Sequence, residues 1–305
     1  MELEELKMKN FYKSIIMFSL FLNSLISQIN HPYPPLDLVS IPTAGTLPRG
    51  SFTIETLLMK NGGMVPKLLV GLTDNFSIGM SFGVQNFIGE SKPIVNKETP
   101  EVQIKYRLFE ESESQPAFLI GLDTQGFGPF IQRAEKIIRY DYIYDESNNL
   151  VLDESGSPLF EAIKEDKEIS RYEQKAWGVY AVLSKNWDLF GNLGFHLGIN
   201  RNTFETKDND EDWNLFFGLD KEINRSFSFL AEYNAALNDG KEYTSIDQDM
   251  GINDIVVGKG KGFLNAGLRW NVAQNLLIEI NFKDINLDND DFVNREIKIM
   301  YSEIF

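Results

Sequence analysis

The amino-acid sequence predicts an all-β fold, a closed antiparallel transmembrane β-barrel of about twelve strands, with a range of roughly ten to fourteen. Three observations predict it. Apolar and polar residues alternate with a period of two in segments spread over the chain after residue 50. The connections between these segments are alternately short and long. No run of about twenty apolar residues follows the first thirty positions, which excludes a helical membrane span in the mature chain.

The alternation is clearest in residues 76–85, where large apolar side chains occupy one face and Ser, Gly and Gln the other. Comparable alternation runs through 101–108, 192–200, 213–220, 227–237, 264–272 and 278–283. Weaker segments are 51–58, 67–72, 116–125 and 175–185, and 295–305 closes the set. One face of a barrel strand meets lipid and the other the lumen, so the mean hydropathy stays low, here −0.23.

The connection lengths give an independent test of the strand number. Every even-numbered connection is short, namely 74–75, 110–115, 186–191, 221–225 and 273–275. The odd-numbered ones are longer, namely 89–99, 126–171, 206–212, 238–261 and 284–294, with only 60–65 as a short exception. Outer-membrane barrels have short periplasmic turns and long extracellular loops. This parity predicts an even number of strands with both termini in the periplasm.

The first fifty residues set the compartment. Lys9 and Lys13 precede an apolar run that ends in small residues before Gln28, so residues 1–27 are predicted to be a secretory signal peptide. Translation is expected to start at Met8, because the seven residues before it are acidic in character. A short membrane anchor is the alternative. The proline-rich segment 28–50 is predicted to be a periplasmic lead-in or a plug, and 51–305 the barrel in the outer membrane of a Gram-negative cell.

Composition argues against several classes of function. The chain has no Cys, which excludes thiol catalysis and Cys-ligated metals, and its net charge of −16 argues against nucleic-acid binding. Gly79–Gly83 matches the G-x-S-x-G motif of hydrolases, but it lies within a strand pattern and not at a strand-to-helix turn. Residues 208–212 begin like a calcium loop, yet Trp213 stands where the turn glycine is required, so a solvated extracellular loop is expected. We predict no enzymatic activity, no cofactor and no bound metal.

The lumen face is where a function should be sought, and its charged residues have both signs. The predicted lumen-lining residues are Glu55, Lys105, Arg107, Asp123, His196, Asp220, Glu232, Arg269, Glu279, Lys283 and Lys298. Two interpretations remain open, either cross-strand ion pairs that fill a narrow barrel or the lining of a charged channel. The lead-in from residue 29 to 50, or the loop 126–171, is a candidate to block the bore.

Several short motifs carry a resemblance to a known family. These are Ile41–Phe52 (IPTAGTLPRGSF), Asn61–Gly63 (NGG), Val70–Gly79 (VGLTDNFSIG) and Leu230–Asn234 (LAEYN). The chain resembles uncharacterised outer-membrane barrels that are distantly similar to YjbH-type proteins, which are associated with exopolysaccharide production. The resemblance covers most of the mature chain and implies the barrel fold and the compartment.

Together these observations predict a channel or export component for small solutes or glycan. The alternative is a structural or surface-interaction barrel with a filled lumen and partner-binding extracellular loops. The expected partners are outer-membrane lipid and lipopolysaccharide, and the barrel-assembly machinery through a C-terminal strand that ends in Phe305. No nucleic-acid partner is expected.

Overall fold

The structure is a computed structural model, and it describes residues 35–247, 252–258, 260–286 and 293–304. The predicted signal peptide, the start at Met8, the first part of the lead-in and Phe305 therefore lie outside the described residues.

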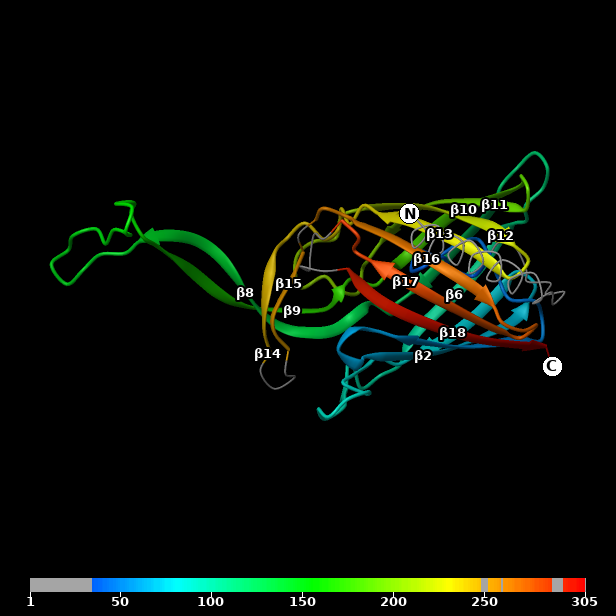
Figure 1. The fold of residues 1–305 in the computed structure, drawn as a ribbon, viewed down its shortest axis with the longest axis horizontal. Helices are drawn as coiled ribbons and strands as arrows, with labels where there is room; N and C mark the ends of the chain where they lie inside the picture. Colours follow the sequence, from blue (N-terminus) through cyan, green and yellow to red (C-terminus); the bar gives the residue numbers. More distant parts are fainter. Residues whose placement is uncertain (1–34, 248–251, 259, 287–292, 305) are drawn as a thin grey trace, which may run out of the picture.

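Twelve antiparallel strands form a closed barrel, as the sequence predicts (Figure 1). β1 pairs with both β2 and β18, so no barrel strand is left as a free edge. The barrel strands are β1 (Ser51–Leu58), β2 (Met64–Thr73), β3 (Phe76–Ser81), β6 (Glu101–Phe109), β7 (Ala117–Asp123), β10 (Gly178–Asp188), β11 (Asn192–Arg201), β12 (Asn214–Asn224), β13 (Phe227–Asn234), β16 (Phe263–Asn271), β17 (Leu276–Lys283) and β18 (Asn294–Ile304).

Short turns join β2 to β3, β6 to β7, β10 to β11, β12 to β13 and β16 to β17. These turns share one end of the barrel with the start of β1 and the end of β18; we call it the turn end. The long connections lie at the other end, the loop end. The short connection there contains the one-turn η1 (Lys60–Gly62), and β4 (Val84–Gln85) and β5 (Ile94–Val95) add a small hairpin. The predicted parity of connections and the number of twelve strands are confirmed.

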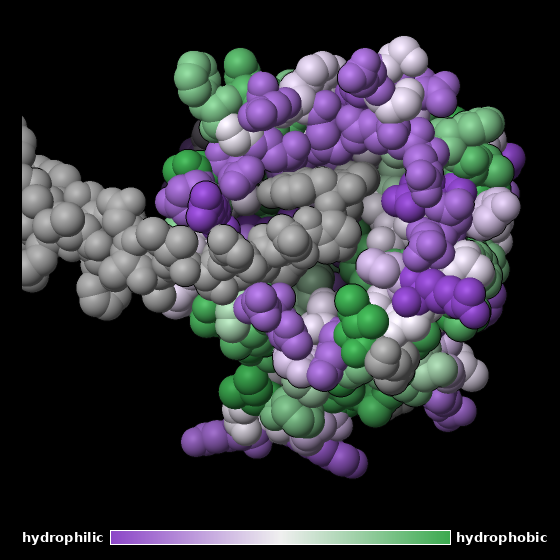
Figure 2. Space-filling model, turned by 90° about the vertical axis from the view of Figure 1, so that its right-hand side faces the viewer, coloured by the Kyte–Doolittle hydropathy of each residue, from purple (hydrophilic) through white to green (hydrophobic). Residues whose placement is uncertain are grey.

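The side chains sort by face as the alternation requires. On β1, Ile54 is 48% exposed and Glu55 is 3% exposed; on β11, Leu197 is 50% exposed and His196 is 2% exposed. Apolar side chains therefore cover the outside of the barrel and polar ones the inside. Figure 2 views the turn end, where hydrophilic residues form much of the rim and hydrophobic residues appear around the circumference. No helix in the described part of the chain has the length and apolar character of a membrane span.

The connection 126–171 differs from the predicted loop. It forms most of a long hairpin of β8 (Phe127–Tyr142) and β9 (Phe160–Gln174) that extends well beyond the barrel (Figure 1). β14 (Tyr243–Asp247) and β15 (Ile252–Val257), from another predicted loop, complete a four-stranded sheet in the order β15-β14-β8-β9. The β8–β9 pairing contains three register shifts, which break the period-two pattern in the sequence and hide these strands.

Residues 36–47 lie inside the barrel, and we call them the plug. Leu38, Val39, Ile41 and Ala44 of the plug are at most 2% exposed. They belong to one apolar cluster with inward side chains of the wall, namely Ala117, Leu119, Trp177, Tyr180, Val182, Phe216 and Leu230. The plug thus packs against an apolar patch of the wall inside a core that is otherwise polar.

Candidate functional site

The two ends of the plug lie at the same mouth of the bore. Leu36 and Leu47, at its two ends, both line a cavity of about 490 Å³ that is also lined by Gln274 and Asn275 of the β16–β17 turn. Between them the chain reverses: Asp37 bridges Pro42, and the Leu38 N–H donates to the Ile41 carbonyl oxygen at 3.0 Å. The plug is therefore a loop inserted from the turn end, with its tip at residues 38–41.

Glu232 on β13 binds the tip of the plug. Its Oε2 accepts hydrogen bonds from the backbone N–H groups of Ser40, at 2.9 Å, and Ile41, at 3.0 Å. The Ser40 hydroxyl donates to Oε1, and the Asn265 amide donates to the same oxygen at 2.7 Å. Glu232 is 2% exposed, and among the described residues no Lys or Arg forms an ion pair with it. Donors of the plug tip, rather than a cation, compensate most of this buried charge.

Cations bind the first two residues of the plug, Leu36 and Asp37, which we call its stem. The stem lies nearer the turn end than the tip does. Lys298 Nζ lies 2.8 Å from Asp37 Oδ1 and donates to the Leu38 carbonyl at 3.0 Å. Arg269 donates to the Asp37 carbonyl at 2.9 Å, and Lys105 donates to the Leu36 carbonyl. Both cations also form ion pairs with Glu279: Lys298 Nζ lies 3.1 Å from Oε2, and Arg269 Nη2 lies 2.5 Å from Oε1. Because β16 runs from the loop end to the turn end, Arg269 lies closer to the turn end than Asn265 does.

A third attachment runs along β10, β11 and β12. The Ala44 N–H of the plug donates to Ser184 Oγ at 2.9 Å. Ser184 Oγ lies 2.7 Å from His196 Nδ1, and His196 Nε2 lies 2.8 Å from Asp220 Oδ1. These residue types also form hydrolytic triads. Here Ser184 lies within a strand, directly opposite His196. Its hydroxyl oxygen accepts the hydrogen bond from the Ala44 N–H, so the arrangement anchors the plug.

The predicted lumen residues lie at three levels of the bore. Side chains that are at most 7% exposed are Glu55, Lys105, His196, Asp220, Glu232, Arg269, Glu279, Lys283 and Lys298. Asp123 is half-buried beside the plug, and Arg107 is half-buried at the turn end, where it donates to Asn75 Oδ1. Lys283 lies towards the loop end, with Nζ 3.8 Å from the centroid of the Phe127 ring and 3.7 Å from Glu296.

The predicted lumen set lacks Lys67, whose Nζ lies 3.3 Å from Glu55 Oε1, and the uncharged members of the site. The Trp177 indole N–H donates to the Ser40 carbonyl at 3.1 Å, and Ser77 Oγ accepts from the Leu47 N–H at 3.0 Å. Ser184 and Asn265 were missed for the same reason, because only inward charges were selected. The inward register of each strand could have identified Ser77, Ser184 and Asn265.

Two small cavities lie deeper in the bore than the 490 Å³ cavity of the turn end. One cavity of about 50 Å³ lies beside the plug, lined by Glu55, Lys67, Lys105 and Asp123 among others. A second, also about 50 Å³, lies nearer the loop end and is lined by Phe127, Lys283 and Glu296. Cavities of this size hold only a few water molecules. In the described part of the chain, the plug and the side chains around it therefore close the bore beyond the turn-end cavity.

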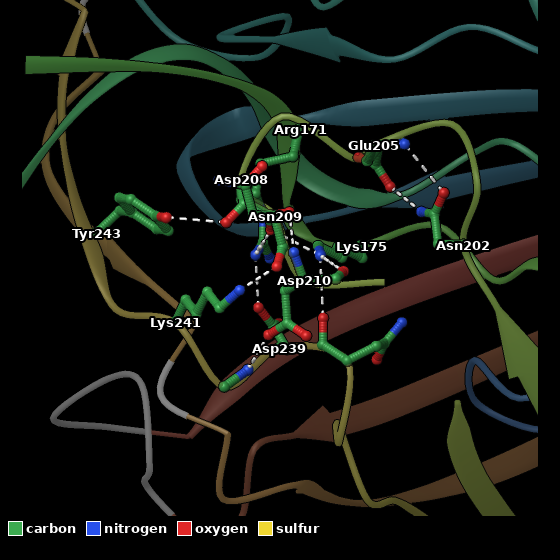
Figure 3. Close-up of polar contacts among 12 residues, drawn as sticks. Arg171, Lys175, Asn202, Glu205, Asp208, Asn209, Asp210, Asp239, Lys241 and Tyr243 are labelled. Carbon is green, nitrogen blue, oxygen red and sulfur yellow. Dashed lines mark hydrogen bonds and ion pairs between the residues drawn. The ribbon is translucent and has the colours of Figure 1, made fainter. Parts of the chain in front are cut away.

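A buried ion-pair cluster closes part of the loop end (Figure 3). The Arg171 guanidinium lies 3.1 Å from Asp208 and 2.6 Å from Asp239, and Lys175 lies 2.6 Å from Asp208. The Tyr243 hydroxyl donates to the Asp208 carbonyl at 2.9 Å. The cluster ties β9 and β14 to the β11–β12 and β13–β14 connections, and we call it the cap.

The cap corrects the expectation of a solvated loop at two positions, Asp208 and Asp210, while residues 209, 211 and 212 are exposed as expected. Asp208 is 0% exposed and Asp210 is 4% exposed, and the two carboxylates accept from Arg171 and from the Gly240 N–H. The carboxylate of Glu205 accepts from the Tyr172 N–H at 2.6 Å, and burial raises its pKa. In the described ranges, no group of acidic or His residues has an arrangement that could hold a metal. The basic partners come from β9 and its end, so the loop sequence alone does not reveal them.

Comparison with known proteins adds little beyond the architecture. No family model and no curated protein matches the chain. A KdgM porin is similar in structure at 10% identity, with a TM-score of 0.38, covering 84% of this chain and 99% of that one. A NanC porin is 9% identical with a TM-score of 0.39, and the match covers 83% of this chain and 99% of that one. The Acinetobacter baumannii outer membrane protein Omp33 is 8% identical with a TM-score of 0.38, and the match covers 84% of this chain and 97% of that one. At these scores the likeness carries no argument about function, and the resemblance to YjbH-type barrels depends on sequence motifs alone.

Proposed function

We propose that the protein is an outer-membrane channel for small solutes, held closed here by a plug that can withdraw. The apolar exterior supports the membrane location. Ile54, Leu197, Phe217 and Ile280 belong to different strands and are 47–50% exposed. A closed barrel satisfies all its backbone hydrogen bonds within the sheet, which is what a bilayer requires of a spanning structure.

The path of the plug is the observation that carries the proposal. Both ends of the plug lie at the turn end, as far as the described chain runs, and its only β-bridge, Asp37 with Pro42, is within the plug itself. Its attachments to the wall are side-chain contacts and not a strand ladder. The plug can therefore withdraw without unthreading the chain and without breaking the barrel sheet.

Withdrawal would leave a bore that water can fill. Withdrawal exposes the apolar wall patch that packs on the plug, but it also releases Glu232, Lys298 and Ser184, which water can hydrate. Eight strands leave room only for side chains and sixteen leave an aqueous channel, so twelve strands suit a narrow channel. Small solutes fit this width; glycan, which the sequence resemblance implies, is a second possible cargo.

Single-channel recording with a lockable plug tests the proposal. The chain has no Cys, so a pair introduced at Ser40 and Asn265 is unique; these side chains approach to 3.4 Å. We expect conductance steps from the wild-type protein and from the reduced Ser40→Cys/Asn265→Cys variant, and none after oxidation to the disulfide. Ser40→Cys alone should be insensitive to oxidant.

Two outcomes would contradict the channel. Unchanged conductance after oxidation would show that solutes do not need the plug to move. Silence at every voltage, both in the wild type and in a variant lacking residues 36–47, would show that the barrel is no channel. The second outcome would favour a surface-interaction barrel. One observation supports that alternative: the β8–β9 hairpin exposes Ile138, Tyr140 and Phe160 to 58, 63 and 53%.

A further inference from the structure

We propose that plug residues 37–42 occupy a binding site for a small zwitterionic solute, and that such a solute releases the plug by replacing it. The inference rests on the proposed function, because it names the solute that opens the channel. It follows from the groups that the plug presents to the wall.

One end of the site requires hydrogen-bond donors. Glu232 is fully enclosed and accepts the two N–H groups and the hydroxyl of the plug tip. When the plug leaves, Asn265 is the only hydrogen-bond partner of Glu232 that remains among the described residues. Water in the open bore can hydrate this carboxylate, but a cationic donor also compensates its charge and forms stronger hydrogen bonds with it. An ammonium group, with three donors and a positive charge, meets this requirement.

The other end requires an anion. Four cations face the plug stem, namely Lys67, Lys105, Arg269 and Lys298. The wall supplies three anions beside them, Glu55, Glu279 and Asp123. Asp37 of the plug is the fourth, so its departure leaves four positive against three negative charges. A carboxylate at Lys298 restores the balance.

A zwitterion satisfies both ends at once. A simple ammonium ion would leave Lys298 without the Asp37 carboxylate, and a simple carboxylate would leave Glu232 without donors. A neutral polyol would supply neither a cation for Glu232 nor an anion in place of Asp37, although Lys298 keeps its contact with Glu279. Asp37 and Ser40 are three positions apart in a tight turn, so the two charged groups of the solute should be separated by a few carbon atoms.

Thiol labelling of the plug tests the site without relying on conductance. Val39 is 2% exposed, so Val39→Cys in the folded full-length barrel in detergent should react slowly with an uncharged maleimide. We expect ω-amino acids with two to five methylene groups to accelerate labelling at least fivefold. Alkylammonium ions, alkyl carboxylates and sorbitol, at matched ionic strength, should have little effect. Ser147→Cys on the exposed hairpin should label at a constant rate throughout.

Variants separate the two ends of the site. In the Val39→Cys background, Lys298→Met should abolish the response to ω-amino acids, and Glu232→Gln should remove the advantage of the ammonium group. Heat-modifiable migration on a gel checks that each barrel has folded. Acceleration by sorbitol equal to that by ω-amino acids, or none by any ω-amino acid at 100 mM, would overturn the inference.

The two proposals can fail separately. Conductance that the plug disulfide abolishes, combined with labelling that is insensitive to ω-amino acids, would refute the zwitterion site and leave the channel intact. Accelerated labelling combined with electrical silence would support the site and refute the channel.

Discussion

Glu232 is an unusual buried carboxylate, because its partners are backbone and hydroxyl donors of a segment about 190 positions away in the sequence. Each hydrogen bond to a charged group contributes about 1.5–3 kcal/mol. The three donors of the plug tip converge on this one side chain. A single residue of the wall thus has a large influence on the position of the plug.

Replacing Glu232 by Gln should loosen the plug. The amide retains one acceptor oxygen but turns an NH₂ group, itself a donor, towards the donors of Ser40 and Ile41. We expect the basal labelling rate of Val39→Cys to rise about tenfold, which corresponds to about 1.4 kcal/mol. Glu161→Gln, on the exposed hairpin, is the control and should have no effect. An unchanged rate would mean that Glu232 does not hold the tip.

At the cap, Arg171 is likewise a single buried charge that binds several partners, here Asp208 and Asp239. Burial opposes its charge, but Asp239 and Asp208 outweigh this effect and raise its pKa, so it stays protonated. Arg171→Met would leave Asp239 buried without its cation, at a cost of about 3–5 kcal/mol. We expect faster amide hydrogen exchange in 202–213 and 235–243, and little change in the barrel strands.

Arg201→Met is the matched control for the cap. Its guanidinium contacts Glu211 at 3.4 Å, and both side chains are more than 40% exposed. An exposed pair contributes at most about 1 kcal/mol. Equal exchange in the two variants would show that the buried cluster does not stabilise the cap.

At the scale of elements, the barrel strands could be predicted and the strands of the long loops could not. Barrel strands have one apolar and one polar face over their whole length, and this is why alternation located all twelve. β8 and β9 face solvent on both sides over their distal half, and register shifts interrupt their pattern. The plug has no periodicity either, because it is an irregular loop whose apolar residues meet the wall at different levels.

The distal hairpin should be dispensable for the barrel. β14 pairs with β8 only at Ala134 and Glu135, and the core of this sheet lies at the proximal half, around Ile131 and Ile169. Replacing residues 138–161 by an Asn-Gly turn should preserve heat-modifiable migration, channel conductance and hydrogen exchange at the cap. Ile131→Ala, which removes a fully buried side chain, should instead destabilise the sheet by about 2–5 kcal/mol. Loss of the folded barrel on shortening would contradict this modular arrangement.

At the scale of the whole molecule, alternation predicted which way the charges point but not which groups they bind. Glu55 and Lys298 face inward because a strand has only two faces. The partner of Lys298 is Asp37, which is 261 positions away on an irregular segment. Such a pairing depends on the register between neighbouring strands, on how deeply the plug inserts, and on how the plug packs against the wall. Sequence patterns contain none of these, so the candidate site emerged only from the structure.

The arrangement of an apolar exterior around a polar interior makes a prediction about the whole barrel. Leu197 lies near the middle of β11, is 50% exposed, and is opposite Leu183 and Phe217 of the neighbouring strands. In a bilayer, Leu197→Arg would place a charge in the hydrocarbon, at a cost of about 2–4 kcal/mol near the midplane. We expect urea unfolding from phospholipid vesicles to show this loss. Leu150→Arg, on the exposed hairpin, should change stability by less than about 0.5 kcal/mol. If both substitutions were equally neutral, the apolar exterior would not face lipid, and the barrel would have to be placed in an aqueous compartment.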